Sequence, residues 1–126
     1  MRKIRKIIVH CSDSDIPDHD DISVIDKWHK ARGWAGVGYH YFIKSDGTVQ
    51  DGRPDDVIGA HVSGHNHDSL GICLHGRHNF TEAQFFSLKA LLYDLMTRYD
   101  LRTTDIYGHR DFDSKKTCPN FDVKRI

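Results

Sequence analysis

The sequence predicts an α/β (α+β) fold in a single domain, residues 1–126, with a central mixed β-sheet flanked by helices. Three stretches carry this prediction. The β-branched apolar run at 6–10 is typical of a strand that is buried on both faces. Residues 69–75 alternate as a strand does, and residues 81–99 place apolar side chains at helical spacing behind a capping-box pattern.

The first half of the chain begins with the strand at 6–10 and continues into an acidic, polar loop. A helix is expected to begin at Asp21 or Ser23, since either side chain can cap it, and to run to about Arg32. Gly33 then ends the helix. The order of these elements already indicates a strand that is followed by a helix on one face of the sheet.

The middle of the chain predicts a hairpin and a long loop. A second strand is expected at 38–43, and the Asp46-Gly47 pair is a turn signal that returns the chain through Val49. Residues 52–67 are rich in Gly, Asp, His and Asn and show little periodicity. We interpret them as a long loop, and long loops in small domains are often functional.

The last third predicts one long helix and one short strand. The helix behind Thr81 should end near Asp100, and a strand is expected at 105–109. A polar loop follows, and residues 121–126 resemble the start of another helix.

Composition excludes several classes of partner. Lys and Arg total 18, and Asp and Glu total 18, so the formal net charge is zero. We therefore expect neither nucleic acid nor an anionic membrane as a partner, and we expect a monomer. No stretch is long and apolar enough to span a bilayer, and no signal peptide is evident, so we expect the chain to be cytoplasmic as synthesised.

Histidine and cysteine are the residues that can carry chemistry here. The chain has ten His and three Cys, and an odd number of widely separated cysteines favours reduced thiols over a disulfide framework. His10 ends the first predicted strand and His109 ends the last. If those strands are parallel neighbours, both imidazoles meet at the carboxyl edge of the sheet, and the loop that holds Cys118 can reach them.

Two imidazoles and one thiolate make a three-ligand zinc set that leaves a fourth position for water, as in catalytic sites. The spacing alone is weak evidence. The alternative is ordinary: a strand-end histidine bonded to backbone, a loop histidine and a small buried cysteine.

Five motifs follow one another along nearly the whole chain. They are Ile8-Val9-His10-Cys11-Ser12; Trp28-His29-Lys30 with Gly33-Trp34 and Val37-Gly38-Tyr39-His40-Tyr41; Lys44-Ser45-Asp46-Gly47-Thr48-Val49 with Gly52-Arg53; Gly59-Ala60-His61 with Asn66-His67-Asp68-Ser69-Leu70-Gly71-Ile72-Cys73-Leu74; and Gly108-His109-Arg110 with Lys116-Thr117-Cys118-Pro119-Asn120-Phe121. With these motifs the chain resembles the zinc-dependent N-acetylmuramoyl-L-alanine amidases of the small phage-lysozyme type, which share a fold with peptidoglycan recognition proteins.

The resemblance implies a function and a set of residues. His10, His109 and Cys118 would hold one Zn²⁺ per chain, with Tyr39 and Lys116 as the catalytic pair. The implied reaction is hydrolysis of the amide bond between N-acetylmuramic acid and L-alanine in bacterial peptidoglycan. The implied setting is a phage or prophage endolysin that acts on the cell wall after release.

Physical chemistry supports the two catalytic roles. An amide is a poor electrophile, and zinc polarises carbonyls and lowers the pKa of water from about 15.7 to about 7. Tyr39 can hold that water or relay its proton. Lys116 precedes Cys118 by two residues and can face the oxyanion from the same side of an extended segment. The alternatives are a core tyrosine and a solvated lysine.

The remaining site residues come from the long loop. His61 and His67 are expected to contact substrate in a groove, whereas a second metal site built from them and His65 is the weaker interpretation. His40 should point away from Tyr39, because successive strand residues face opposite sides. Asp111 and Asp113 are expected to orient His109.

Two other functions fit the same motifs. A peptidoglycan-binding protein of this fold that does not cut would lack the thiolate ligand, and Cys118 argues against it. A structural zinc site or a redox cysteine would need a fourth strong protein ligand, and none is evident. A glycosidase is disfavoured, since the usual mechanism needs two carboxylates and the one glutamate, Glu82, sits at a helix cap.

Overall fold

A five-stranded mixed sheet forms the centre of the computed structural model, which describes residues 2–123. The strands lie in the spatial order β3-β2-β4-β1-β5. They are β1 (Lys6–Cys11), β2 (Tyr41–Ile43), β3 (Val49–Asp51), β4 (Ser69–Leu74) and β5 (Ile106–Gly108). β1 lies between β4 and β5 and runs parallel to both, β2 runs parallel to β4, and β3 is antiparallel to β2. The predicted mixed sheet is confirmed.

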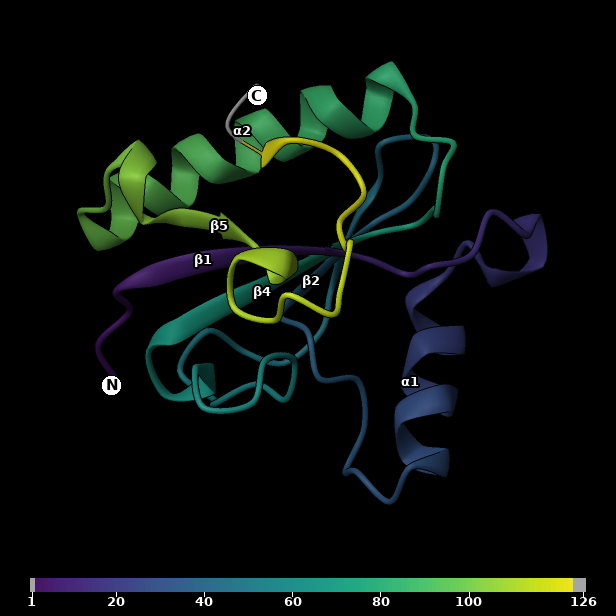
Figure 1. Cartoon of the computed structure of the whole chain (residues 1–126), viewed down its shortest axis with the longest axis horizontal. Coiled ribbons are helices and arrows are strands. Elements are labelled where there is room, and N and C mark those ends of the chain that lie inside the picture. Colours follow the sequence, from purple (N-terminus) through teal and green to yellow (C-terminus); the bar gives the residue numbers. More distant parts are fainter. Residues whose placement is uncertain (1, 124–126) are drawn as a thin grey trace.

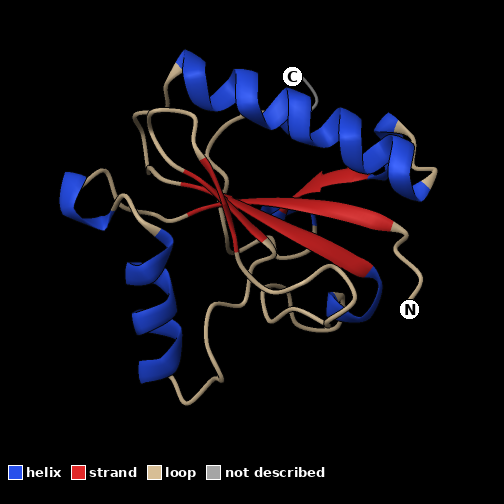
Figure 2. Ribbon diagram, turned by 180° about the vertical axis from the view of Figure 1, so that it is seen from behind, coloured by secondary structure: helices blue, strands red, loops and turns tan. Residues whose placement is uncertain are grey.

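Two helices cover the two faces of this sheet. α2 (Glu82–Tyr99) lies along one face, and α1 (Ile22–Ala31) lies on the other side, as Figures 1 and 2 show from opposite directions. Single turns of 3-10 helix form at Pro17–His19, Asn66–Asp68, Thr103–Asp105 and His109–Asp111. The expected flanking helices therefore both form, within one or two residues of their predicted ends.

Alternation along β1 divides the core between the two helices. Ile7 and Val9 belong to the apolar cluster that packs under α2, and both are fully buried. His10 directly follows Val9 and therefore points to the opposite face. Burying each aliphatic side chain contributes about 1.5–3 kcal/mol, so the α2 face supplies most of the stability and the α1 face is free to hold polar side chains.

The N-terminus of α2 is the best-defined local structure predicted from the sequence. Thr81 accepts a hydrogen bond from the backbone N–H of Gln84 at 3.1 Å, and the Gln84 side chain accepts one from the N–H of Thr81 at 2.9 Å. The Thr81 hydroxyl also donates to the carbonyl of Ser45 at 2.6 Å. This capping box therefore anchors the helix to the β2–β3 turn.

The second strand is shorter than predicted, because the long loop packs its own backbone against residues 38–40. The carbonyl of Gly38 accepts from Ala60 N–H at 3.0 Å, and the carbonyl of Tyr39 accepts from Arg53 N–H at 3.0 Å. A Cβ at Gly38 would lie 2.1 Å from the Ala60 carbonyl oxygen. The glycine thus permits a contact that replaces regular pairing.

The long loop, residues 52–67, is fastened from two sides. The Arg2 guanidinium donates to the backbone carbonyl of Asp55 at 3.0 Å. The Asp55 carboxylate accepts from the hydroxyls of Tyr41 at 2.6 Å and Tyr99 at 2.5 Å. These contacts tie the loop to the N-terminal segment, the sheet and α2, and the 3-10 turn at Asn66–Asp68 is the one regular element at its end.

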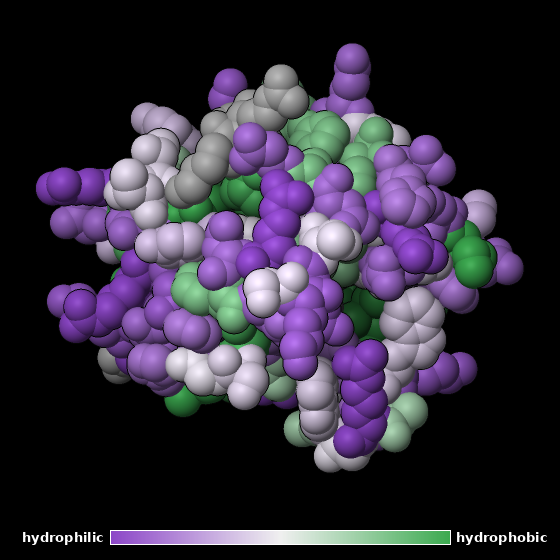
Figure 3. Space-filling model, viewed as in Figure 1, coloured by the Kyte–Doolittle hydropathy of each residue, from purple (hydrophilic) through white to green (hydrophobic). Residues whose placement is uncertain are grey.

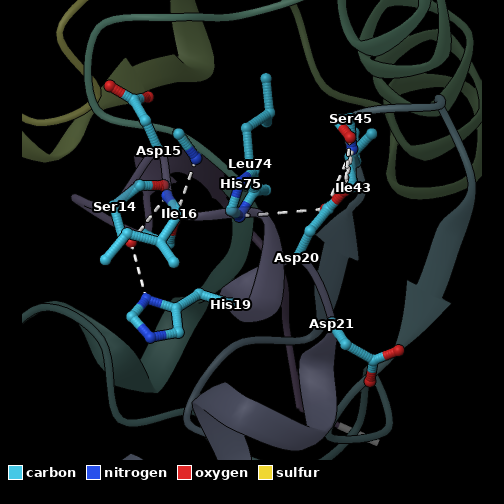
Figure 4. Close-up of polar contacts among 12 residues, drawn as sticks. Ser14, Asp15, Ile16, His19, Asp20, Asp21, Ile43, Ser45, Leu74 and His75 are labelled. Atoms are coloured by element: carbon cyan, nitrogen blue, oxygen red, sulfur yellow. Dashed lines mark hydrogen bonds and ion pairs between the residues drawn. The ribbon is translucent and has the colours of Figure 1, made fainter.

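The segment between β1 and α1 is tied to the sheet by polar side chains. Figure 4 shows Asp20 directed toward Ser45 and His75, while Ser14 lies beside His19. The Asp20 carboxylate accepts from the N–H of Ser45 at 3.0 Å and lies 3.9 Å from Nδ1 of the buried His75. The Ser14 hydroxyl is 2.7 Å from Nδ1 of His19. These contacts therefore hold the acidic loop in place beside the carboxyl edge of the sheet.

The surface is mainly hydrophilic. The face in Figure 3 shows small apolar patches among polar side chains. The large exposed apolar side chains include Phe86 and Tyr93 on the outer side of α2. None of the helices within residues 2–123 has the length and apolar character needed to cross a bilayer.

The C-terminal predictions meet different outcomes. The strand expected at 105–109 forms as the shorter β5, since His109 already begins a 3-10 turn. The helix start expected at 121–126 lies largely outside the described residues.

Replacing Thr81 with alanine should lower the free energy of unfolding by about 1–2 kcal/mol, since both the helix cap and the contact with Ser45 are lost. Thr97→Ala on the exposed side of α2 is the matched control. Its hydroxyl only bonds the carbonyl of Tyr93 in the same helix, so we expect a change below about 0.5 kcal/mol. Urea denaturation of both variants measures the difference, and equal midpoints would show that the cap contributes nothing.

Candidate metal centre and active site

The parallel pairing of β1 with β5 brings two histidines together. Val9 is opposite Gly108 in the register, so His10 and His109 follow at the same carboxyl edge of the sheet. Nδ1 of His10 lies 3.2 Å from Nδ1 of His109. The sequence prediction placed both imidazoles at this edge on the condition that these strands are neighbours, and the structure meets that condition.

The segment after β5 adds the cysteine. It turns back across the ends of the central strands (Figure 1), and the carbonyl of Cys118 accepts from the N–H of Arg110 at 2.9 Å. The backbone N–H of Cys11 points at Sγ of Cys118 from 3.0 Å. The ligand atoms of His10, His109 and Cys118 lie within 4.8 Å of one another, and no other such group occurs in residues 2–123.

The chemistry of these three donors suits a zinc ion. Burial and the neighbouring histidines lower the pKa of His10 well below its usual value, and burial and Lys116 lower the pKa of His109. Both rings are therefore neutral and offer a lone pair. The thiol of Cys11 and burial raise the pKa of Cys118, so the Cys118 thiolate requires a cation beside it. Two neutral nitrogens and one sulfur form a borderline-soft set of the kind that binds Zn²⁺.

A cavity of about 450 Å³ opens beside the three donors. His109 and Cys118 form part of its wall, and Tyr39 and Lys116 line it as well. A cavity of this size suits a small molecule or part of a polymer. Two of the implied ligands and the implied catalytic pair thus share one cavity, and His10 lies next to it, 3.2 Å from Nδ1 of His109.

The ring of Tyr39 packs beside the ring of His10 and lines the cavity. The centroids of the two rings are 4.9 Å apart, and the Tyr39 ring is 5.4 Å from that of His29. Burial raises the pKa of Tyr39 well above its ordinary value, so the phenol keeps its proton and can donate it in a hydrogen bond.

Lys116 ends a turn. Its backbone N–H donates to the carbonyl of Asp113 at 3.0 Å, and its side chain is exposed at the cavity. That Lys116 faces the oxyanion from the same side as Cys118 stays a prediction.

The two histidines expected to contact substrate lie in different surroundings. His61 lines the cavity, and its Nδ1 is 2.8 Å from Nε2 of His10. Burial and nearby His40 lower the pKa of His61 to about 3, so its ring is neutral. His67 is exposed, lies 3.7 Å from the Asp68 carboxylate, and is absent from the cavity wall formed by residues 2–123. Substrate contacts by His61 and His67 stay predictions.

The aspartates expected to orient His109 serve the backbone instead. The Asp111 carboxylate accepts from the N–H of Gly108 at 2.8 Å, and the Asp113 carboxylate accepts from the N–H of Lys115 at 3.0 Å. These bonds stabilise the turns that carry His109 and Lys116, so the two carboxylates shape the loop around the site.

Sequence reasoning gave no role to several residues of the cavity wall. Arg32 and Trp34 follow α1, and Arg77 comes from the loop after β4. Arg77 is ion-paired with Asp13 at 3.3 Å, and its backbone N–H donates to the Asp15 carboxylate at 2.7 Å. The exposed aromatic Trp34 directly after a helix-ending glycine is the one signal that sequence offered for this side of the cavity.

Comparisons with known proteins find similar sequences and similar solved structures. A sequence profile described as N-acetylmuramoyl-L-alanine amidase matches residues 1–121. The endolysin of Enterobacteria phage T3 is 42% identical over 94% of this chain and 82% of its own length. Peptidoglycan-recognition protein SC2 of Drosophila melanogaster is 39% identical over 72% of this chain and 51% of its own length. The solved N-acetylmuramoyl-L-alanine amidase LysC from Clostridium intestinale superposes with a TM-score of 0.88 at 35% identity, covering 98% of this chain and 83% of that protein.

His29, on the cavity wall, should make stability depend on pH. Its buried Nδ1 accepts the N–H of Gly38 at 2.8 Å, and burial followed by the charge of Arg32 lowers its pKa to about 4. The unfolded chain binds this proton first, so the stabilisation is complete above pH 6.5 and falls as the pH drops toward 4. Between pH 6.5 and 5, the advantage of the metal-free wild type over His29→Gln should shrink by up to about 2 kcal/mol.

Urea denaturation at several pH values measures this difference. A difference between wild type and His29→Gln that stays constant over this pH range would contradict a neutral, hydrogen-bond-accepting His29.

Proposed function

This chain belongs to the N-acetylmuramoyl-L-alanine amidase family, and we propose that His10, His109 and Cys118 form its zinc centre, with Tyr39 and Lys116 as the catalytic pair. The protein hydrolyses the amide bond between N-acetylmuramic acid and L-alanine in peptidoglycan, as a phage endolysin does. The observation that carries the proposed centre is the meeting of three metal-ligating atoms within 4.8 Å, from residues 10, 109 and 118, beside a cavity.

The reaction needs an activated water and a stabilised oxyanion. Zinc bound by these three residues would act as a Lewis acid and would lower the pKa of a water. The water oxygen adds to the lactyl carbonyl carbon, the carbon–nitrogen bond breaks, and the nitrogen leaves with a proton as the free amine of L-alanine. The protein must therefore hold the carbonyl, guide one proton and compensate one transient negative charge.

Tyr39 and Lys116 fit these last two tasks. The phenol of Tyr39 keeps its proton and lies beside His10, so it can donate a hydrogen bond to the attacking or the carbonyl oxygen. Lys116 brings a positive charge to the cavity wall next to Cys118. A preorganised donor of this kind contributes about 3–4 kcal/mol to the transition state.

The charge of the cavity rim suits the substrate class. Arg32, Arg77 and Lys116 line the cavity, and the one carboxylate among the lining residues, Asp13, is paired with Arg77. Stem peptides of peptidoglycan carry carboxylates, which such cations bind. We propose that the protein works as a monomer on the cell wall after release, and that nucleic acid and membrane are not its partners.

Substituting Cys118 tests the metal centre. Cys118→Ser should lose most of the bound zinc and the activity, because a hydroxyl is a far poorer ligand than a thiolate. Cys11→Ser is the matched control, since it changes the neighbouring sulfur but leaves the proposed ligands, and it should keep about one zinc per chain. Elemental analysis measures the metal, and labelling of new N-terminal alanine amines measures hydrolysis. Full zinc content and activity in Cys118→Ser would exclude the proposed ligand set.

Kinetics separate the catalytic pair from residues that only bind substrate. Tyr39→Phe and Lys116→Ala should keep their zinc and lose about 10²–10³-fold in kcat, with kcat/KM falling in parallel. Lys115→Ala removes the adjacent charge and should lower kcat less than about tenfold. A rise in KM at unchanged kcat in the first two variants would make them substrate contacts.

A further inference from the structure

The ring of His10 is held from behind by a chain of three hydrogen bonds. Its Nε2 lies 2.8 Å from Nδ1 of His61, and Nε2 of His61 lies 3.2 Å from the hydroxyl of Ser69. The Ser69 hydroxyl lies 2.7 Å from the backbone carbonyl of His65. Ser69 is fully buried, so water does not compete for these bonds.

The carbonyl at the end of this chain fixes the direction of every bond. A carbonyl oxygen can only accept a hydrogen bond, so the hydroxyl of Ser69 donates its single proton to the backbone carbonyl of His65. Ser69 must then accept the proton on Nε2 of His61. A neutral imidazole carries one N–H, so Nδ1 of His61 is bare and accepts from Nε2–H of His10. The Nδ1 of His10 consequently carries a lone pair and no proton, and it lies 3.2 Å from Nδ1 of His109.

Packing prevents the His61 ring from leaving this position. A Cβ at Gly59 or at Gly71 would lie 2.8 Å from atoms of the His61 ring, so the two glycines form a slot that the ring fills. The side-chain oxygen of Asn66 accepts from the backbone N–H groups of His61 at 3.0 Å and Val62 at 2.9 Å. Both the backbone and the ring of His61 are thereby held, as a preorganised support requires.

We propose that His61 and Ser69 are positioning residues that fix the tautomer of His10, so that its Nδ1 is a ready ligand before any metal arrives. The hydrogen-bond directions stand without the metal, while the consequence for zinc affinity rests on the proposed function. Ligand histidines usually donate their second N–H to a carboxylate, a carbonyl or water, and losing that partner costs about 10–100-fold in metal affinity. Here a second imidazole, backed by a buried serine, takes that place.

Metal-free protein labelled with ¹⁵N at histidine provides the first test. Long-range ¹H–¹⁵N spectra distinguish the two neutral tautomers, and we expect both His10 and His61 as Nε2–H. A His10 ring protonated at Nδ1 in the wild type would overturn the proposal. If the tautomers are as expected but the protein binds no zinc, the proposed metal centre fails and the hydrogen-bond chain stands.

Ser69→Ala provides the second test. Removing the acceptor of Nε2–H should mix the tautomers of His61 and His10 and weaken zinc binding about 10–100-fold in competition with a chelator. Ser87→Ala is the control, because its hydroxyl bonds the carbonyl of Gly47 far from the site, and it should keep both the spectrum and the affinity. Wild-type tautomers and zinc affinity in a folded Ser69→Ala would overturn the role of Ser69. If His61→Asn only raised KM at unchanged zinc affinity, His61 would be a substrate contact instead.

Discussion

Parallel pairing of β1 with both β4 and β5 is the constraint on which the rest of this structure depends. It places the carboxyl ends of the three strands at one edge, so His10 and His109 approach each other without a local motif. The α2 face of the sheet is filled with aliphatic side chains, which leaves the opposite face to hold polar rings. The apolar layer thus supplies the stability that buried imidazoles and a buried serine cost.

The loops after β1 and β5 complete the site, and both are held by polar contacts to the backbone. The segment after β5 is held where the N–H of Cys11 meets Sγ of Cys118. The acidic loop after β1 is fastened by Asp20 (Figure 4). The same loop carries Asp13 to the cavity rim. Few of these contacts are made between charges alone, so the frame of the site depends little on ionic strength.

The sequence predicted the elements that depend on residues close together in the chain. The helical periodicity of apolar residues and the Thr81 capping box were enough to predict α2, and the β-branched run was enough to predict β1. The position of Cys118 was not local information, because the loop of nine residues after His109 can take many paths. The residues alone made Cys118 a weak candidate ligand, and the family resemblance strengthened it. The surroundings of His61 were equally inaccessible, because they depend on glycines at 59 and 71 that face one ring only after folding.

The long sequence separation within the centre has a consequence for biosynthesis. The three proposed ligands come from residues 10, 109 and 118, and the strand that bears the first lies between β4 and β5, which are both made after it. A nascent chain that stops short of residue 118 holds at most two of the proposed ligands, and one that stops short of residue 106 also leaves β1 without β5 along one side. The proposed centre would therefore assemble only after residue 118 has been made, so copies that stop before it would lack the third proposed ligand.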